Sequence, residues 1–425
     1  MFRIAVLSVH TSPLAPLGGW ETGGMNVYVR ELGRELAARG AELDIFTRRQ
    51  SPDSPEVVEY APGARVVHVD AGPQRHVDKY EVLDYIPDFA CGIQRWRALT
   101  GRRYDLIHSH YWLSGRLGVL FRDRWGVPLV SMFHTLAQLK NRVAESPAER
   151  EQRVRYDIEQ RTMAASDRIV ALTEIDRAQI LKHYGPLATA ISVIPGGVDL
   201  RRFRPLPRGA ARAELGLPAE ARVLLFVGRI QRLKGVEVLL RAFGELRRQE
   251  PDLDLRLVLA GGLPGSATAR GSHESREIAR LRRLAAHLDG GDRVLFAGAV
   301  PQERLPTYYS AADVTVMPSS YESFGLVAVE SLACGTPVVA TRVGGLTTVV
   351  RDGETGYLVP WRDPSLFAER LRTLLTADEP RLTMAARARP SVLRFDWGRI
   401  ADQHVALYQE LIGLSARESQ AGVSG

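Results

Sequence analysis

A strand, a polar turn, a helix and a second strand follow one another between Val314 and Val338, and this order constrains the fold more than any other stretch. Val314 and Val316 belong to an apolar strand, Gly335 ends the helix, and Pro337 opens the next strand. Two strands joined in this way by a helix form a βαβ unit. We therefore expect a parallel sheet with helices on its faces.

The same alternation of apolar strands and helices runs through both halves of the 425-residue chain. In the first half it predicts strands over residues 4–10, 42–48, 65–70, 105–110, 127–134 and 168–173, and helices over 25–39, 85–99, 112–125 and 148–166. In the second half it predicts strands over 222–228, 255–261, 293–298, 313–317, 337–341 and 357–359, and helices over 235–248, 274–289, 303–311, 325–334 and 364–376.

This pattern predicts an α/β protein with two doubly wound domains, each long enough for its own core. Prolines and glycines interrupt the pattern at residues 194–206, where we place the linker. The predicted domains are residues 1–196 and 197–396, followed by a last helix at about 397–413 and by disordered residues after Ser415.

The turn before the 325–334 helix carries groups that suit a sugar nucleotide. Glu322 lies in the turn, and Glu330 lies about one and a half turns into the helix, at about 1.5 Å per residue. Backbone N–H groups at Phe324, Gly325 and Leu326 suit an anion, and Gly325 lets a ligand approach closely. Two solvated glutamates on an amphipathic helix are the alternative interpretation.

The sequence Glu322-x-Phe-Gly-Leu, followed by Glu330 and Cys-Gly-Thr-Pro, resembles the E-x7-E motif of retaining glycosyltransferases of family 4. The resemblance covers nearly the whole chain. It implies the GT-B fold, with two Rossmann-like domains facing each other across a ligand cleft and the last helix packed back on the first domain. It also implies that Glu322 holds donor-sugar hydroxyls and Glu330 the ribose hydroxyls.

Three further stretches carry expected donor contacts. Gly23 and Gly24 open the helix after the first strand, where a backbone can approach a phosphate. Arg229 and Lys234 flank a turn that resembles the diphosphate clamp of the family, and two fixed cations can neutralise a leaving diphosphate without a metal. His134 ends a strand and resembles the histidine that contacts the donor sugar near its anomeric centre. The expected catalytic residues are His134, Arg229, Lys234 and Glu322.

The acceptor residues come from one subgroup, the N-acetylglucosaminyltransferases that act on inositol phosphate in mycothiol synthesis. The positions that bind the acceptor there match Asn26, Lys79, Tyr111, Thr135 and Arg155 in this chain, with Arg153 as an alternative to Arg155. A lysine, an arginine, a phenol and a hydroxyl suit a phosphate dianion. Of the 56 lysines and arginines only Lys79, Lys140, Lys182 and Lys234 are lysine, which favours special positions for them.

Composition excludes several other classes. The net charge of +7 favours anionic ligands, but the arginines are scattered, so we expect no nucleic acid partner. Apolar runs are shorter than the roughly 20 residues of a membrane span, no signal peptide is visible, and the two cysteines fit a reducing cytoplasm. Spacings typical of metal ligands are missing from the sequence.

The expected function is a cytoplasmic, retaining, metal-independent transfer of a sugar from a UDP-sugar to a phosphorylated small polyol. UDP-N-acetylglucosamine is the best donor and 1D-myo-inositol 3-phosphate the best acceptor; the UDP-sugar is a co-substrate, and no other cofactor is expected. A sucrose or sucrose-phosphate synthase is the nearest alternative, although those enzymes tend to carry glutamine after the glycine pair, where this chain has Met25 and Asn26. A UDP-sugar epimerase, a non-catalytic nucleotide-sugar binder and a homodimer stay open.

Overall fold

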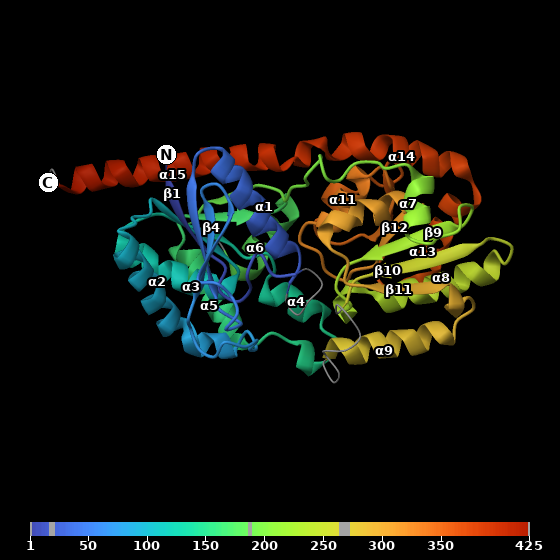
Figure 1. Ribbon diagram of the computed structural model, residues 1–425, viewed down its shortest axis with the longest axis horizontal. Helices are drawn as coiled ribbons and strands as arrows, with labels where there is room; N and C mark the ends of the chain where they lie inside the picture. The colour runs from blue at the N-terminus through green and yellow to red at the C-terminus, as the bar shows by residue number, and fades with distance from the viewer. Residues whose placement is uncertain (1, 17–21, 186–188, 263–272, 424–425) are drawn as a thin grey trace. The chain divides into compact units, whose positions relative to one another are not determined.

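Each of the two units of the chain is built around its own sheet (Figure 1). The computed structural model describes residues 2–16, 22–185, 189–262 and 273–423. Unit 1 comprises Met1–Ala15, Gly24–Pro195 and Trp397–Gly425, and unit 2 comprises Pro16–Gly23 and Gly196–Asp396. The predicted glycine pair is therefore divided, with Gly23 in unit 2 and Gly24 in unit 1.

Unit 1 has an eight-stranded sheet in the order β3-β4-β2-β1-β5-β6-β7-β8. Its strands are β1 (Arg3–Leu7), β2 (Glu42–Arg48), β3 (Val57–Ala61), β4 (Ala64–Val69), β5 (Leu106–His110), β6 (Leu129–Met132), β7 (Arg168–Ala171) and β8 (Ile191–Val193). The pairs are parallel except for the edge pair of β3 and β4. The order reverses between β1 and β5, so the loops that follow these two strands diverge there.

Helices cover both faces of this sheet. They are α1 (Gly24–Ala38), α2 (Ile86–Thr100), α3 (Trp112–Trp125), α4 (Ala137–Val143), α5 (Arg153–Ala165), α6 (Glu174–Tyr184) and α15 (Trp397–Val423). Apolar residues of α2, α3 and α5 pack on one face with Ala5 and Leu7, while α15 packs against α1 (Figure 1). Because a strand turns alternate side chains to opposite faces, Ile4 and Val6 are buried on the other side.

Unit 2 has a six-stranded parallel sheet in the order β11-β10-β9-β12-β13-β14. Its strands are β9 (Arg222–Val227), β10 (Leu255–Ala260), β11 (Val294–Gly298), β12 (Val314–Met317), β13 (Val338–Thr341) and β14 (Gly356–Val359). Here the order reverses between β9 and β12. In open sheets of this kind, ligands bind outside the carboxyl ends of the strands at the reversal.

The helices of unit 2 again lie on two faces (Figure 1). They are α7 (Arg208–Glu214), α8 (Val236–Gln249), α9 (His273–Ala286), α10 (Leu305–Ala311), α11 (Leu326–Ala333), α12 (Leu346–Val349), α13 (Pro364–Thr376) and α14 (Asp378–Val392). A continuous apolar core joins α8, α9 and α13 to the strands, and α11 packs against α14. None of the described helices is long and apolar enough to cross a membrane.

The predicted α/β class is confirmed, and most predicted elements lie within a few residues of the observed ones. The prediction missed the edge strands β3 and β8 and several helices, because short or charge-rich segments show little apolar periodicity. The helix predicted over 148–166 begins only at Arg153, since Gln152 is extended. Disorder was predicted after Ser415, whereas α15 continues to Val423, and the residues from 416 to 421 include no glycine or proline that would interrupt a helix.

Buried histidines connect the strand ends of unit 1 to α15. The His108 and His110 rings at the end of β5 lie 4.1 Å apart between centroids, and His110 Nδ1 is 2.9 Å from His134 Nε2. From α15, Tyr408 Oη lies 2.7 Å from His108 Nδ1, and His404 Nε2 lies 2.8 Å from the hydroxyl of Tyr28. Burial lowers the pKa of His134 and of His404 to about 3. The fold therefore keeps these rings neutral.

This cluster predicts that unit 1 loses stability in mild acid. Below a pH of about 6.5 the unfolded chain binds protons that the fold excludes, so stability falls as the pH drops from about 6.5 towards the folded pKa. For each histidine that the fold keeps neutral, the free energy of unfolding is about 2 kcal/mol lower at pH 5 than at pH 8. We expect His404→Gln to make the urea midpoint depend less on pH between 5 and 7. The control is His287→Gln, at an exposed position in unit 2, which should show the same pH dependence of the midpoint as wild type. Equal pH profiles for wild type and His404→Gln would contradict this account.

Candidate active site

In unit 2 the loops that follow β9 and β12 meet at the reversal of the sheet order. Ser320 in the second loop donates its backbone N–H to the carbonyl oxygen of Leu233 in the first, over 2.9 Å. Beside this contact, Lys234 Nζ donates to Glu322 Oε2 over 2.6 Å. Both side chains keep about a fifth of their surface exposed. The two predicted donor residues thus form one ion pair that a ligand can reach.

Two glycines allow close packing around this ion pair. Gly235 has a φ of +69°, and a Cβ there would lie 2.1 Å from the carbonyl oxygen of Pro318. Gly325 caps α11 with a φ of +100°, and a Cβ would lie 2.8 Å from Leu346 Cδ2. Since L side chains avoid this conformation and the space is filled, glycine is required at both positions.

The other predicted donor residues of unit 2 are distributed around this pair. Arg229 follows β9, and a Cβ on Gly23 would lie 3.6 Å from its Nε, which places Gly23 beside the guanidinium. Glu330 is buried in α11, where it accepts hydrogen bonds from Tyr309 Oη over 2.8 Å and Gln302 Nε2 over 3.3 Å.

The predicted residues at the start of α11 contribute by their backbone. The ring of Phe324 is buried in edge-to-face contact with Phe395, at 5.3 Å between centroids. Leu326 is the first residue of α11, directly after Gly325. The helix N-terminus therefore offers backbone N–H groups with partial positive charge on the loop that carries Glu322.

In unit 1 two predicted residues have an unusual backbone. Tyr111 follows β5 with a φ of +77°, and His134 follows β6 with a φ of +59°. Arg362 is the remaining residue other than glycine with positive φ in the described part of the chain. Such strain persists where the surroundings fix it, and it concentrates at functional sites. Both residues lie at the carboxyl ends of neighbouring parallel strands, where this sheet would bind a ligand.

Arg155 joins these strand ends to α5. Its Nη1 donates to Tyr111 Oη over 3.0 Å, and its Nη2 donates to the carbonyl oxygen and Oγ1 of Thr135 over 2.7 and 3.0 Å. Its Nε donates to Glu159 Oε1 over 2.7 Å, and the guanidinium carbon lies 4.8 Å from the centre of the Tyr111 ring. Arg153 points to solvent, with 85% of its side chain exposed, and pairs with Asp157. Between the two alternatives, Arg155 is the one beside Tyr111 and Thr135.

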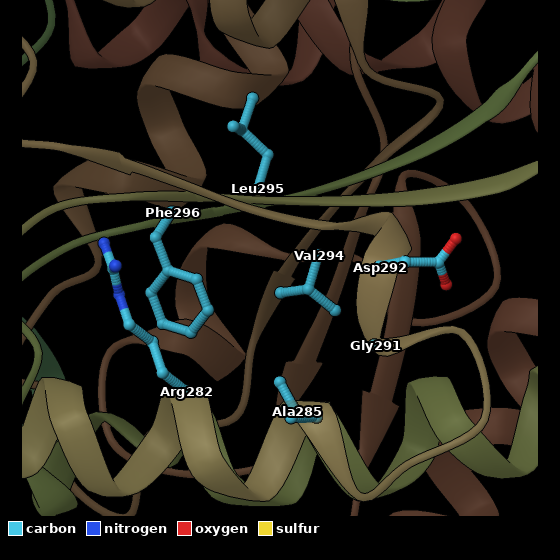
Figure 2. A pocket seen from close by; sticks show the side chains of 8 residues that line it. Arg282, Ala285, Gly291, Asp292, Val294, Leu295 and Phe296 are labelled. Carbon is cyan, nitrogen blue, oxygen red and sulfur yellow. The ribbon is translucent and has the colours of Figure 1, made fainter.

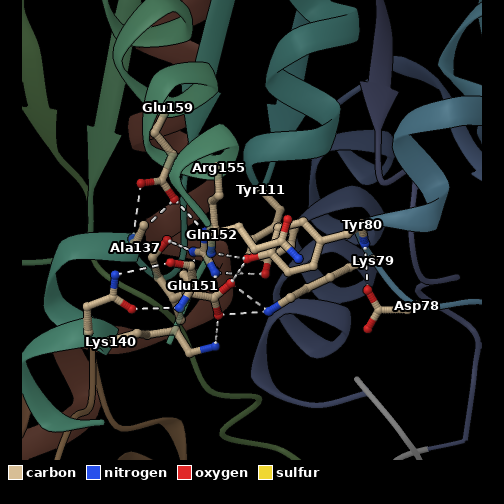
Figure 3. A network of polar contacts seen from close by, with 12 residues as sticks. Asp78, Lys79, Tyr80, Tyr111, Ala137, Lys140, Glu151, Gln152, Arg155 and Glu159 are labelled. Carbon is tan, nitrogen blue, oxygen red and sulfur yellow. Dashed lines mark hydrogen bonds and ion pairs between the residues drawn. The ribbon is translucent and has the colours of Figure 1, made fainter. Parts of the chain in front are cut away.

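Lys79 reaches the same network through Glu151 (Figure 3). Its Nζ lies 2.7 Å from both carboxylate oxygens of Glu151, which also accepts from Lys140 Nζ and pairs with Arg155 Nη1 at 3.0 Å. Burial alone would raise the pKa of Glu151, but the charges of Arg155, Lys140 and Lys79 hold this pKa well below its usual range. Four of the five predicted acceptor residues, Lys79, Tyr111, Thr135 and Arg155, therefore belong to one connected network.

The fifth predicted acceptor residue, Asn26, has a structural contact in the loop after β1. Its side chain is buried, and its Nδ2 donates to Thr11 Oγ1 over 2.9 Å and to the carbonyl oxygen of Ser12 over 2.8 Å. Asn26 thus fixes the loop between β1 and α1. Gly24, at the start of α1, lies directly beside this loop in sequence.

Comparison with known proteins identifies the family. The model of glycosyl transferases group 1 matches residues 207–390, and that of the glycosyl transferase 4-like domain matches residues 23–197. A D-inositol 3-phosphate glycosyltransferase of Kineococcus radiotolerans is 46% identical over 431 residues, which covers 99% of this chain and 98% of the relative. The chain belongs to the family 4 glycosyltransferases of the GT-B fold.

Two further comparisons agree with this assignment. A D-inositol 3-phosphate glycosyltransferase of Saccharomonospora viridis is 46% identical over 411 residues, covering 96% of this chain and 94% of the relative. The solved sucrose-phosphate synthase of Thermosynechococcus elongatus superposes with a TM-score of 0.89 at 35% identity, covering 97% of this chain and 100% of that one. The family resemblance drawn from the E-x7-E stretch is confirmed, and this protein is a glycosyltransferase.

The sequence of this glycosyltransferase gave no expected role to Glu151 and Glu159, the carboxylates of the unit 1 network, and marked Lys140 only as one of four scarce lysines. Glu151, Arg155 and Glu159 are spaced four residues apart, a spacing that places side chains on one side of a helix. This spacing was the available signal for the two carboxylates, and the rarity of lysine was the available signal for Lys140. The spacing was overlooked because residues 136–150 match the family poorly, which left the neighbouring segment without an interpretation.

A hollow of about 570 Å³ lies elsewhere in unit 2 of the glycosyltransferase, between α9 and the edge strand β11 (Figure 2). Phe296 and Val294 point from the strand towards α9, whereas Leu295 points to the opposite side (Figure 2). Arg282 lies over the Phe296 ring at 5.1 Å. None of the predicted donor residues lines this hollow, so the hollow is separate from the candidate donor site.

Within the described residues, no three His, Cys, Asp or Glu side chains come together as a metal site would require. Four cationic side chains of the candidate sites lie beside carboxylates: Lys234 beside Glu322, and Lys79, Lys140 and Arg155 around Glu151.

Proposed function

We propose that this glycosyltransferase moves N-acetylglucosamine from UDP-N-acetylglucosamine to 1D-myo-inositol 3-phosphate, with retention at the anomeric carbon. The network of Lys79, Tyr111, Thr135 and Arg155 is the observation that carries the proposal. It gathers cationic and hydroxyl donors suited to a phosphate dianion at the strand ends of unit 1. The names of the Kineococcus and Saccharomonospora relatives support the same acceptor.

The donor site would lie in unit 2, at the reversal between β9 and β12. Arg229 and Lys234 would bind the diphosphate, and the N-terminus of α11 would add its backbone N–H groups. Glu322, which pairs with Lys234, would bind sugar hydroxyls. Glu330 would bind the ribose hydroxyls, for which it must exchange at least one of its contacts with Tyr309 and Gln302.

The chemistry needs no protein nucleophile. The bond between the anomeric carbon and the diphosphate oxygen lengthens first, and negative charge grows on the leaving diphosphate. Fixed cations at Arg229 and Lys234 stabilise that charge in the transition state without reorganisation. The acceptor hydroxyl attacks from the same face, and a diphosphate oxygen takes its proton, so the configuration is retained. His134 would contact the donor sugar near the anomeric carbon.

A sucrose-phosphate synthase is the second candidate, favoured by the structural match at 35% identity. That enzyme class also takes a phosphorylated acceptor, so the network of unit 1 would serve both. The pair Met25 and Asn26 after the glycines argues against it, because sucrose-forming enzymes tend to have glutamine there. A UDP-sugar epimerase would turn over without any acceptor, and a non-catalytic binder would form no product.

A grid of donors and acceptors tests the function. UDP- and ADP-sugars are combined with inositol 3-phosphate, fructose 6-phosphate, fructose and 3-phosphoglycerate, and products are read by mass, with and without excess EDTA. We expect the largest kcat/KM for UDP-N-acetylglucosamine with inositol 3-phosphate, nearly unchanged by EDTA because side chains supply the positive charge. A preference for fructose 6-phosphate would favour the second candidate. A loss in EDTA that magnesium or manganese restores would contradict the metal-independent mechanism.

The diphosphate contacts predict a large loss of turnover on substitution. Arg229→Ala and Lys234→Ala should each lower kcat by about 10² or more, the loss typical of a removed transition-state contact. Arg241→Ala on α8, an exposed arginine paired with Glu237, is the control for overall charge and should keep wild-type kcat. Retention of more than about a tenth of kcat by either test variant, well short of this loss, would remove that residue from the mechanism.

A further inference from the structure

One buried carboxylate collects three cations from separate segments of unit 1 (Figure 3). Glu151, just before α5, has 2% of its side chain exposed and pairs with Lys79, with Lys140 of α4 and with Arg155 of α5. The hydroxyl of Tyr80 donates to the same carboxylate over 2.5 Å. Such a buried charge is tolerated only where partners satisfy it, and here they do.

The three cations differ in what they can offer a ligand. Arg155 has a fully buried side chain, and its five N–H groups are used by Glu159, Tyr111, Glu151 and the two oxygens of Thr135. A new anion can contact it only by displacing one of these partners. Lys79 and Lys140 keep 17% and 27% of their side chains exposed, and an ammonium group has three donors. The lysines are therefore the cations that a ligand meets first.

The carboxylate also decides where the two ammonium groups lie. Lys79 and Lys140 repel each other, and a lysine side chain has many rotamers to lose on ordering. Because both Nζ atoms donate to Glu151, the two charges stay beside one another. A ligand that needs two cations together then finds them already positioned, which removes an ordering cost from binding.

We propose that Lys140 is a second lysine ligand of the acceptor phosphate, beside Lys79, and that Glu151 is the positioning residue that holds the two ammonium groups together. This proposal rests on the proposed function, because it takes the acceptor to be phosphorylated. It adds to that function the two residues that would make the site selective for a dianion over a neutral polyol.

Protonation supports the same assignment. Burial, and then the charge of Lys79, lowers the pKa of Lys140 to about 8, while the carboxylate of Glu151 acts in the opposite direction and Arg155 adds repulsion. A phosphate dianion against Lys140 raises that pKa. Acceptor binding therefore takes up protons above a pH of about 8, and acceptor affinity falls as the pH rises further.

Four proteins test the proposal: wild type, Lys140→Ala, Glu151→Gln and Lys182→Ala. Lys182 lies exposed on α6 and is the control for loss of a lysine from unit 1. Kinetics are measured with inositol 3-phosphate and with plain inositol, and the Kd of UDP is measured by calorimetry. We expect Lys140→Ala to raise KM for the phosphorylated acceptor about 10- to 150-fold, as for a lost charged hydrogen bond.

Lys140→Ala should leave kcat/KM for plain inositol and the Kd of UDP at wild-type values. Lys140→Arg should recover part of the affinity for inositol 3-phosphate that Lys140→Ala loses. Glu151→Gln should also weaken the phosphorylated acceptor, because the lysines lose their anchor. The fall in acceptor affinity above pH 8 should be shallower in Lys140→Ala than in wild type.

The outcomes separate this proposal from the proposed function. If wild type forms no product with inositol 3-phosphate, the proposed function fails. If wild type turns over and Lys140→Ala matches Lys182→Ala, only the proposal about Lys140 fails. If Glu151→Gln binds the phosphorylated acceptor more tightly than wild type, Glu151 competes with the phosphate, and the positioning role is overturned. If Glu151→Gln does not fold, the KM values and pH profiles of the Lys140 variants test whether Lys140 binds the acceptor phosphate.

Discussion

In a parallel sheet the carboxyl ends of all strands lie on the same side, and this constraint determines where the candidate sites of the chain lie. The loops after β1 and β5 in unit 1, and after β9 and β12 in unit 2, start from such edges at the point where the strand order reverses, and the loop after β6 starts from the strand next to it. Each sheet packs against helices on both faces through a largely apolar core. The candidate residues therefore lie in the loops and in the helices that follow them, and the sheets supply the rigid support that holds charged groups in position.

Within those loops, cations are positioned by carboxylates. Lys234 is held by Glu322, and Lys79, Lys140 and Arg155 surround Glu151. A partly buried cation without a partner would lose hydration without a compensating ion pair, whereas a paired cation stays charged and fixed in position. The carboxylates thus hold positive charge at fixed positions in both units.

The sequence allowed the fold class, most strands and the family to be predicted, because long apolar strands and the Glu322–Glu330 stretch are local signals. It could not show that Glu151 lies among Lys79, Lys140 and Arg155, since these contacts join segments up to about 70 residues apart that only the folded sheet brings together. Asn26 shows a related limit: its motif indicated only a ligand contact, which stays a prediction, and gave no sign that its amide also fixes the loop after β1. Short helices such as α4 and α7 depend on tertiary packing more than on their own periodicity.

The central claim is that the network of unit 1 recognises the phosphate of the acceptor. It is tested most directly by kcat/KM for inositol 3-phosphate and for plain inositol, each in wild type and in Lys79→Ala. Loss of one charged hydrogen bond should lower the value for the phosphorylated acceptor by about 10- to 150-fold. The value for plain inositol, already low in wild type, should change little, because the lost partner was the phosphate. Equal losses for both acceptors would mean that Lys79 supports the fold or the donor, and the claim would be wrong.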